Sequence, residues 1–169
     1  MNEYRERLLG LLGSDSPWEV LEATPGRVAA LVETLGEEGL GRPFGTDKWT
    51  GREVVAHLAD VEIGTGFRIR QMVSEPDHVI QPFDQEAWAR PYPGLDARMA
   101  VRTLAALRPW NLSYYRALSP SDLARVALHP ERGEESVEML IRMQAGHDRN
   151  HLAQLERIAA SPRTGYQTR

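Results

Sequence analysis

The chain has 169 residues, of which 41% are hydrophobic and 26% charged, and its formal net charge at pH 7 is −4. This length predicts one domain with a buried core, and the mild negative charge argues against a nucleic-acid-binding surface. Because there are no cysteines, disulfides, thiolate metal ligands and a protein-derived thiol nucleophile are excluded.

No apolar run approaches the roughly 20 residues that a membrane-spanning helix needs. The first twelve residues, M-N-E-Y-R-E-R-L-L-G-L-L, carry too many charges for a signal peptide. We therefore expect a cytoplasmic protein with no membrane partner.

Helix signals dominate the first half of the chain. Residues 2–12 form an amphipathic stretch, and Thr24-Pro25 predicts the start of a helix over 24–36, with an N-cap oxygen before a proline. Thr50 and Glu53 have the spacing of a capping box, which predicts a helix over 50–74. We expect Trp49 to pack as a hydrophobic staple before it.

The second half begins with an irregular segment over residues 75–94, which contains a short helix over 84–90. Helices are then predicted over 96–118, where Pro109 should introduce a kink, and over 136–161. The segment between them is read as a short helical turn after Ser119 and a turn over 129–134, with no strands. Trp110 is expected in the core.

These elements predict an all-α fold, an up-down four-helix bundle with one long connection between its second and third helices. The core spans about residues 24–160 of a single domain over 1–169. Residues 161–169 form a polar C-terminal tail.

Three histidines form the strongest candidate site. His147 and His151 are spaced i and i+4, so they share one helix face, and His57 lies upstream in V-V-A-H-L-A-D. The pair belongs to a stripe typical of an inward-facing helix seam: Val137, Leu140, Gln144, His147, His151, Leu155 and Ile158. Such histidines are either satisfied polar residues of the core or ligands of one metal ion. Imidazole ligands suit Zn²⁺, Ni²⁺ or Fe²⁺, and three of them leave a coordination position open.

Three segments resemble the DinB/YfiT-like superfamily, a group of proposed metalloenzymes. They are K-W-T-G-R-E-V-V-A-H-L-A-D-V-E at 48–62, F-D-Q-E-A-W at 83–88 and H-D-R-N-H-L-A-Q-L at 147–155. The resemblance covers about residues 25–158. It implies a four-helix bundle that binds a divalent metal through His57, His147 and His151.

The resemblance also implies that the protein forms a homodimer and acts on a small molecule. The family includes S-transferases and an isomerase that use a low-molecular-weight thiol, besides many members without an assigned reaction. A small-thiol S-transferase or a hydrolase-like enzyme is therefore the leading hypothesis. A non-catalytic dimeric bundle related to stress, either metal-stabilised or ligand-binding, and a metal-free helical interaction module remain alternatives.

Several side chains near the histidines are candidates for supporting roles. Asp60, Asn150 and Gln154 are candidates to orient a ligand histidine, and Asp60 or Glu62 to act as acid or base. For each of them, a solvated charge or polar group on a helix is the alternative. Asp148 is the weakest candidate because it points sideways from the histidine face.

Three further residues are candidates to line a substrate pocket: Arg68, Trp88 and Arg90. The arginines would hold an anionic substrate, with surface ion pairs as the alternative. His78 and His129 lie beside a loop or a proline, so we expect both to be exposed and neither to bind the metal.

Overall fold

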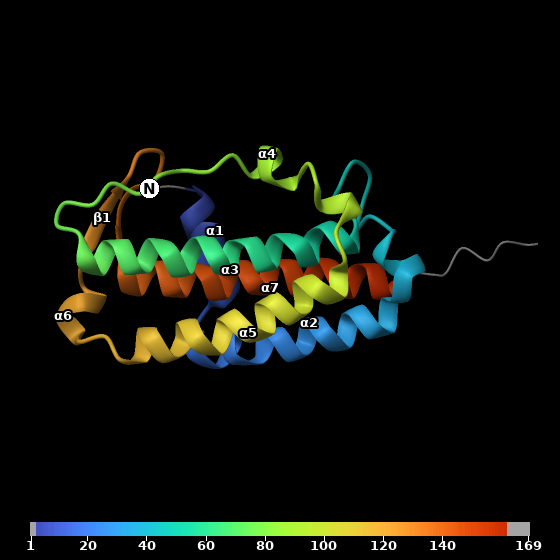
Figure 1. Cartoon of the computed structure of the whole chain (residues 1–169), viewed down its shortest axis with the longest axis horizontal. Helices are drawn as coiled ribbons and strands as arrows, with labels where there is room; N and C mark the ends of the chain where they lie inside the picture. The colour runs from blue at the N-terminus through green and yellow to red at the C-terminus, as the bar shows by residue number, and fades with distance from the viewer. Residues whose placement is uncertain (1–2, 162–169) are drawn as a thin grey trace, which may run out of the picture.

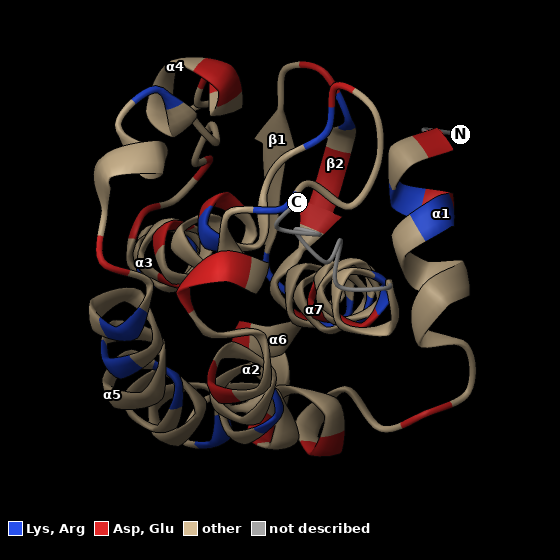
Figure 2. Ribbon diagram, turned by 90° about the vertical axis from the view of Figure 1, so that its right-hand side faces the viewer, with Lys and Arg blue, Asp and Glu red and all other residues tan. Residues whose placement is uncertain are grey.

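Four long helices form the bundle of this computed structural model, which describes residues 3–161 (Figure 1). They are α2 (Pro17–Leu40), α3 (Gly51–Ser74), α5 (Ala97–Arg116) and α7 (Val137–Ala160). Helices α2 and α7 run in one direction, whereas α3 and α5 run in the other (Figure 1). Each helix packs against two neighbours around a common core (Figure 2). The predicted all-α four-helix bundle is confirmed. Its helices do not alternate up and down along the chain as expected, because the consecutive long helices α3 and α5 run in the same direction (Figure 1).

The long connection between α3 and α5 returns along the whole bundle (Figure 1), so both helices start at the same end. Arg52 Nη1, in the first turn of α3, donates a hydrogen bond to the carbonyl of Leu95 at 3.1 Å. The connection contains α4 (Gln85–Ala89) and a 3₁₀ turn, η1 (Tyr92–Gly94). The short helix predicted over 84–90 is thus confirmed, with Asp84 as its N-cap.

The capping box at the start of α3 is confirmed, since Thr50 Oγ1 accepts from the amide of Glu53 and the Glu53 carboxylate accepts from the amide of Thr50. Helix α7 also has a side-chain N-cap, since Ser136 Oγ accepts a hydrogen bond from the amide of Met139 at 3.1 Å. These caps satisfy amides that the helix itself cannot pair. The sequence therefore placed both starts correctly.

The predicted start of the first bundle helix is wrong. Helix α2 begins after Ser16, whose Oγ accepts from Glu19, and it continues through Pro25. A proline inside a helix leaves the carbonyl four residues earlier without its donor. Here that carbonyl belongs to Leu21, and Arg108 Nη1 donates to it at 2.8 Å. A partner from α5 thus offsets part of the cost of Pro25.

The predicted end of that helix coincides with a real break. Gly36 has φ 59° and ψ −175°, a backbone conformation that suits glycine and interrupts helical geometry. Helical structure resumes after it and continues to Leu40.

The expectation that the chain has no strands is wrong. After the short α6 (Pro120–Leu123), strands β1 (Val126–His129) and β2 (Gly133–Ser136) form an antiparallel hairpin. Main-chain bonds also join Leu128 to the long connection, at His78 and Ile80. Ala127 and His129 face inward, so His129 is 1% exposed, against the expectation of an exposed side chain.

Helix α1 (Glu3–Leu12) lies outside the four-helix core and packs against α7 (Figure 2). The two backbones are close at Gly146, because a Cβ added there would lie 2.0 Å from the carbonyl oxygen of Leu8. Arg149 Nη1 donates to the carbonyl of Leu11 at 3.1 Å, near the end of α1. The helix is therefore held over the part of α7 that carries His147.

Two further expectations concern α5 and the end of the chain. Trp110 is 66% exposed, so its expected place in the core is wrong; it lies on the outer side of a helix that is continuous through Pro109. The predicted tail, apart from Ser161, lies outside the described residues. None of the described helices is both long and apolar enough to cross a membrane.

Candidate metal centre

The three predicted histidines meet inside the bundle. His57 comes from the second turn of α3, and His147 and His151 lie one turn apart on α7. The Nε2 atom of His147 lies 3.0 Å from Nε2 of His57 and 3.0 Å from Nε2 of His151. All three side chains are buried, with exposures of 1%, 7% and 6% for His57, His147 and His151.

This arrangement suits a cation better than hydrogen bonds among the rings. One proton on Nε2 of His147 can serve only one of its two contacts well, whereas a cation between the rings serves all three nitrogens. The nitrogen ligands of a tetrahedral zinc ion lie about 2.0–2.1 Å from the metal and therefore roughly 3.3 Å from one another. This is close to the 3.0 Å that separates Nε2 of His147 from Nε2 of His57 and from Nε2 of His151. Within residues 3–161, no fourth histidine or carboxylate joins this group. The donor set therefore fits a divalent ion with an open position.

Burial keeps the three imidazoles neutral, as metal ligands must be. It lowers the pKa of His57 to about 3, with a smaller contribution from His151. It also lowers the pKa of His151 to about 4. For His147, burial and then the two neighbouring histidines lower the pKa well below its usual value. Their lone pairs are thus available at neutral pH.

Gln154 has the geometry expected of a residue that orients a ligand. Its Oε1 lies 2.7 Å from Nδ1 of His151, so it accepts that proton and leaves Nε2 free to bind a metal. The Nδ1 atoms of His57 and His147 have no hydrogen-bond partner among the described residues. Within this part of the chain, Gln154 is therefore the side chain that fixes a tautomer.

The two other candidates for this role have different partners. Asp60 accepts a hydrogen bond from the hydroxyl of Tyr92 at 2.7 Å, and Asn150 Oδ1 lies 3.4 Å from Arg7 Nη1. Neither side chain contacts a ligand histidine among the described residues. These hydrogen bonds direct Asp60 to the long connection and Asn150 to α1, so that the role of either side chain in orienting the histidines stays a prediction.

Trp49, which precedes the N-cap of α3, packs on the core cluster that contains Val54 and also packs against the histidines. Its ring lies edge-on to His57, with centroids 4.8 Å apart, and is stacked 6.4 Å from His151. Tyr92 packs edge-on to Trp49 at 6.1 Å. An aromatic wall therefore closes one side of the site.

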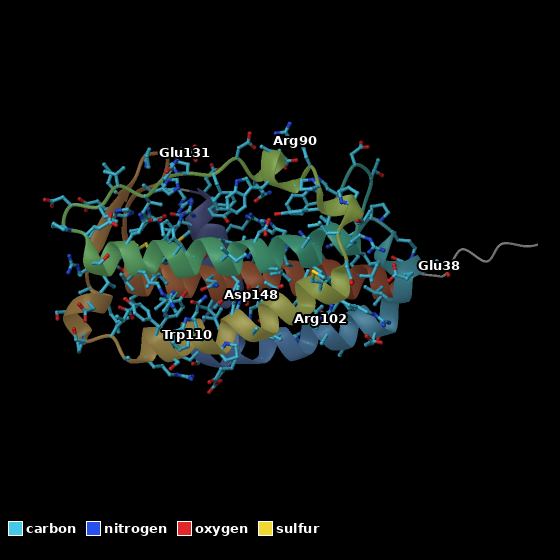
Figure 3. The ribbon with its side chains drawn as sticks, in the orientation of Figure 1. Glu38, Arg90, Arg102, Trp110, Glu131 and Asp148 are labelled. Carbon is cyan, nitrogen blue, oxygen red and sulfur yellow. The ribbon has the colours of Figure 1, made fainter. Side chains whose placement is uncertain are left out.

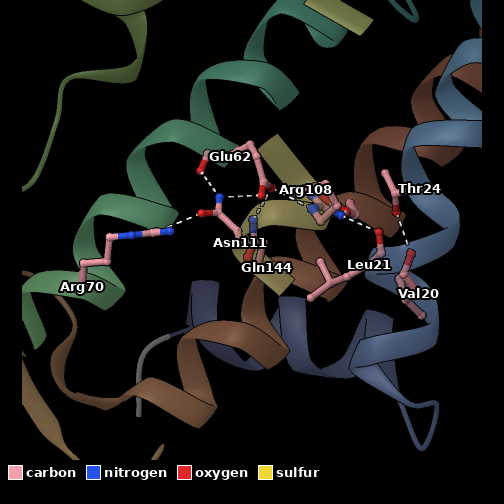
Figure 4. A network of polar contacts seen from close by, with 9 residues as sticks. Val20, Leu21, Thr24, Glu62, Arg70, Arg108, Asn111 and Gln144 are labelled. Carbon is pink, nitrogen blue, oxygen red and sulfur yellow. Dashed lines mark hydrogen bonds and ion pairs between the residues drawn. The ribbon is translucent and has the colours of Figure 1, made fainter. Parts of the chain in front are cut away.

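Glu62 is not a free acid or base. It is fully buried and binds Arg108 Nε at 2.7 Å, Asn111 Nδ2 at 2.8 Å and Gln144 Nε2 at 2.7 Å (Figure 4). Its carboxylate is thus fully engaged beneath the site, and the interpretation of Glu62 as a catalytic group is wrong.

Asp148 also belongs to this network. It lies inside the bundle (Figure 3), 1% exposed, where its Oδ2 accepts from Arg108 Nη1 at 2.7 Å. Its sideways direction from the histidine face, inferred from the helix geometry, brings it to an ion pair in the core. Glu62 on α3 and Asp148 on α7, two buried carboxylates of the helices that carry the histidines, are therefore paired with one arginine.

Two cavities reach the histidines in the described part of the chain. One, of about 300 Å³, is lined by His57 and His147 and extends along α3 and α7. The other, of about 490 Å³, is lined by His147, His151 and Trp49. Besides His147, both cavities share three lining residues: Tyr4, Leu8 and Gln85.

Of the three predicted pocket residues, only Arg68 lines one of these cavities, the first. Trp88 lies outside both, is 41% exposed and stacks on Phe83 at 4.5 Å. Arg90 points away from the bundle (Figure 3), and its Nε donates locally to Ala87. Neither Trp88 nor Arg90 therefore lines a cavity that reaches the histidines, as far as the described residues show.

Some lining residues were not predicted as site residues. His129 and Arg132 enter the first cavity from the hairpin, and Tyr4 and Leu8 enter from α1. No local motif marks them, because tertiary packing alone brings these segments over the bundle. Gln144 did have a signal, since it belongs to the stripe of His147 and His151.

Known proteins are similar to this chain in sequence and in fold. The family model of the DinB superfamily matches residues 20–155. A relative from Oceanobacillus iheyensis named "Putative metal-dependent hydrolase" is 32% identical over 136 residues, which cover 80% of this chain and 79% of the relative. A relative from Bacillus mycoides with the same description is 29% identical over the same shares of the two chains.

The solved structure of YfiT from Bacillus subtilis superimposes with a TM-score of 0.80 at 25% identity, covering 84% of this chain and 83% of YfiT. YfiT is described as "a probable metal-dependent hydrolase with an unusual four-helix bundle topology". The family model, the relatives and the fold agree, and the chain belongs to the DinB superfamily.

Proposed function

We propose that this protein is a metal-dependent hydrolase of small molecules, with a divalent ion held by His57, His147 and His151. The convergence of the three buried histidines carries the proposal: Nε2 of His147 lies 3.0 Å from Nε2 of each of the other two, and the three ligand atoms lie within 4.8 Å of one another. The relatives from Oceanobacillus iheyensis and Bacillus mycoides, which are named as metal-dependent hydrolases, support it.

When bound, a divalent ion lowers the pKa of a coordinated water and polarises a carbonyl group. The residues of the chain prepare the site for it. Burial keeps the histidines neutral, Gln154 accepts the Nδ1 proton of His151, and Trp49 packs edge-on against His57. The first cavity gives a small substrate a route to the open position.

Thiol S-transfer is a second candidate, and one observation favours it. The two cavities meet at His147, and together they offer space for two molecules beside the same centre. A transferase needs a substrate and a thiol together, whereas a hydrolase needs a substrate and water. Because the chain has no cysteine, the thiol would be a low-molecular-weight cosubstrate.

Elemental analysis of the protein purified without an affinity tag or chelator tests the metal site. We expect about one divalent ion per chain in the wild type and much less in His57→Ala and His151→Ala, which should remain helical by circular dichroism. His78→Ala is the matched control, since His78 pairs with Glu75 outside both cavities. Stoichiometric metal in both ligand variants would refute the site.

Assays of the loaded protein separate the two reactions. Ester and amide substrates are tested with and without a small thiol such as cysteine. Turnover that is independent of thiol supports the hydrolase. A thioester product, formed by attack of the thiol on the ester carbonyl with loss of the alcohol, supports the transferase. Metal binding without either activity would favour the non-catalytic bundle.

The identity of the metal, a homodimeric assembly and a cytoplasmic location are further proposals. Elemental analysis identifies the metal, and sedimentation equilibrium measures the molecular mass of the assembly. Microscopy of the tagged protein in its host cell tests the location.

A further inference from the structure

The first cavity has a polar end far from the histidines. One face of α3 forms its floor, through His57, Val61, Thr65 and Arg68 at positions i, i+4, i+8 and i+11. At a rise of 1.5 Å per residue, the Cα atoms of His57 and Arg68 lie about 16 Å apart. Because helical side chains tilt toward the N-terminus of their helix, the side chain of Arg68 is directed toward His57. A ligand that joins the two ends is therefore roughly 10 Å long.

Arg68 is fixed at this end without an acidic partner. Its Nη2 donates to the carbonyl of Gln81 at 2.8 Å, and its guanidinium lies over the ring of Phe83, 4.9 Å from the centroid. No carboxylate of residues 3–161 forms an ion pair with it. Burial and then the neighbouring Arg132 lower the pKa of Arg68, so an anion beside this guanidinium would be stabilised.

His129 adds a directed donor beside Arg68. Its Nδ1 accepts from the amide of Glu131 at 3.2 Å, so the neutral ring carries its proton on Nε2. The side chain is buried and lines the same cavity.

The other arginine at this end is already neutralised. Arg132 donates through Nε and Nη2 to Glu135 at 2.7 and 2.8 Å. Arg5 lies 3.9 Å from the same carboxylate. Glu135 is therefore engaged by Arg132 and Arg5, whereas Arg68 has no ion pair among the described residues.

Gln144 provides an acceptor between the two ends. Its Nε2 donates to Glu62 at 2.7 Å, which fixes the amide, and its buried Oε1 has no hydrogen-bond partner among the described residues. The residue lines the cavity one turn before His147. A substrate with an N–H group at this depth would satisfy the oxygen.

We propose that Arg68 and His129 form a carboxylate-binding subsite, and that the substrate is a small amide with a carboxylate tail. The carboxylate lies at Arg68, the amide N–H faces Gln144 and the amide carbonyl reaches the three histidines. A single unpaired guanidinium matches a carboxylate in charge and in its two-pronged geometry. This inference rests on the proposed hydrolase for the reacting end, whereas the subsite itself depends only on residues at the other end.

A pair of hydroxamates tests the subsite in the metal-loaded protein. One is the monohydroxamate of suberic acid, and the other has a carboxamide in place of the carboxylate. By calorimetry we expect the wild type to bind the carboxylate about tenfold more tightly. In Arg68→Gln this preference should fall to within about twofold, while the affinity for the carboxamide stays unchanged.

Arg90→Gln is the matched control and should keep the full preference, because Arg90 lies outside the cavity. His129→Gln should lose part of it. Equal affinities for the two hydroxamates in the wild type, or an undiminished preference in Arg68→Gln, would overturn the subsite.

Octanoate and octanamide, which lack the metal-binding group, separate the two proposals. If the hydroxamates bind no better than these compounds and no metal is found, the proposed hydrolase fails. A preference for octanoate that depends on Arg68 would still support the subsite in that case. If the carboxamide hydroxamate binds tightly but no compound shows a preference for carboxylate, the subsite alone fails.

Discussion

Nη1 of Arg108 donates to the main-chain oxygen of Leu21 at 2.8 Å, and this oxygen lacks its helical donor because Pro25 follows four residues later. The same guanidinium, which is 2% exposed, binds Glu62 and Asp148 at 2.7 Å each. Arg108 lies on α5, and its three partners lie on α2, α3 and α7. One buried side chain therefore connects all four helices of the bundle.

Replacing Arg108 should be strongly destabilising. Arg108→Ala leaves two buried carboxylates and a main-chain oxygen without their partner, a change that costs about 3–5 kcal/mol in the free energy of unfolding. Urea denaturation followed by circular dichroism measures the loss. Arg116→Ala is the control, since Arg116 pairs with Glu22 at the half-exposed surface and should contribute at most about 1 kcal/mol. Equal losses in the two variants would contradict this role of the network.

A methyl group at Gly146 should displace α1. The added Cβ would lie 2.0 Å from the carbonyl oxygen of Leu8, so Gly146→Ala forces the two backbones apart and costs about 1–3 kcal/mol. Hydrogen exchange of α1 amides should rise. Gly10→Ala is the control, because a Cβ there meets nothing within 4 Å and should stabilise α1 by about 0.5–1 kcal/mol. Unchanged exchange in Gly146→Ala would mean that α1 is not held at this point.

Removing the partner of His151 should weaken metal binding. Gln154→Leu deletes the acceptor 2.7 Å from Nδ1 of His151, and loss of such a partner typically lowers metal affinity ten- to about a hundredfold. Competition with a chromophoric chelator measures the affinity. Asn150→Leu, on the same helix but bonded toward Arg7, should leave it unchanged. The opposite ranking of these two variants would show that Asn150 orients the ligand instead.

The metal-free protein should lose stability as the pH falls below about 6.5. The folded-state pKa values of His57 and His151 are lowered to about 3 and about 4, so below 6.5 the unfolded chain binds more protons than the folded one. Each of these histidines then costs about 1.4 kcal/mol per pH unit down to its folded pKa.

Urea midpoints at pH 7.5, 6 and 5 measure this slope above the range where most carboxylates titrate. His151→Asn removes one of the groups and should flatten the curve. A wild-type stability that does not change between pH 7.5 and 5 would mean that the folded protein accommodates charged histidines.

Local signals in the sequence predicted much of the site. The i, i+4 spacing of His147 and His151 fixes both on one face of α7, and the capping box at Thr50 sets the start of α3 and thus the depth of His57. These features depend on residues a few positions apart, so a single sequence carries them.

The predictions were wrong where contacts between residues far apart in the sequence determine the structure. The sequence predicts a helix start at Pro25, because nothing nearby in the chain shows that Arg108 pairs with the freed carbonyl of Leu21. His129 was expected to be exposed because the inward register of a four-residue strand leaves no clear pattern. The sequence makes Glu62 a candidate acid or base, but its carboxylate pairs with Arg108, 46 positions away in the chain.

The separation of the ligands along the chain bears on how the protein folds. His57 and His147 are 90 positions apart, and the cavity between them is lined by segments from α1 to α7. Closing so long a loop belongs to the late stages of folding, since distant contacts form after local ones. We therefore expect added metal to slow unfolding far more than it speeds folding. The ion would then stabilise the bundle after it has folded, and it would not nucleate its folding.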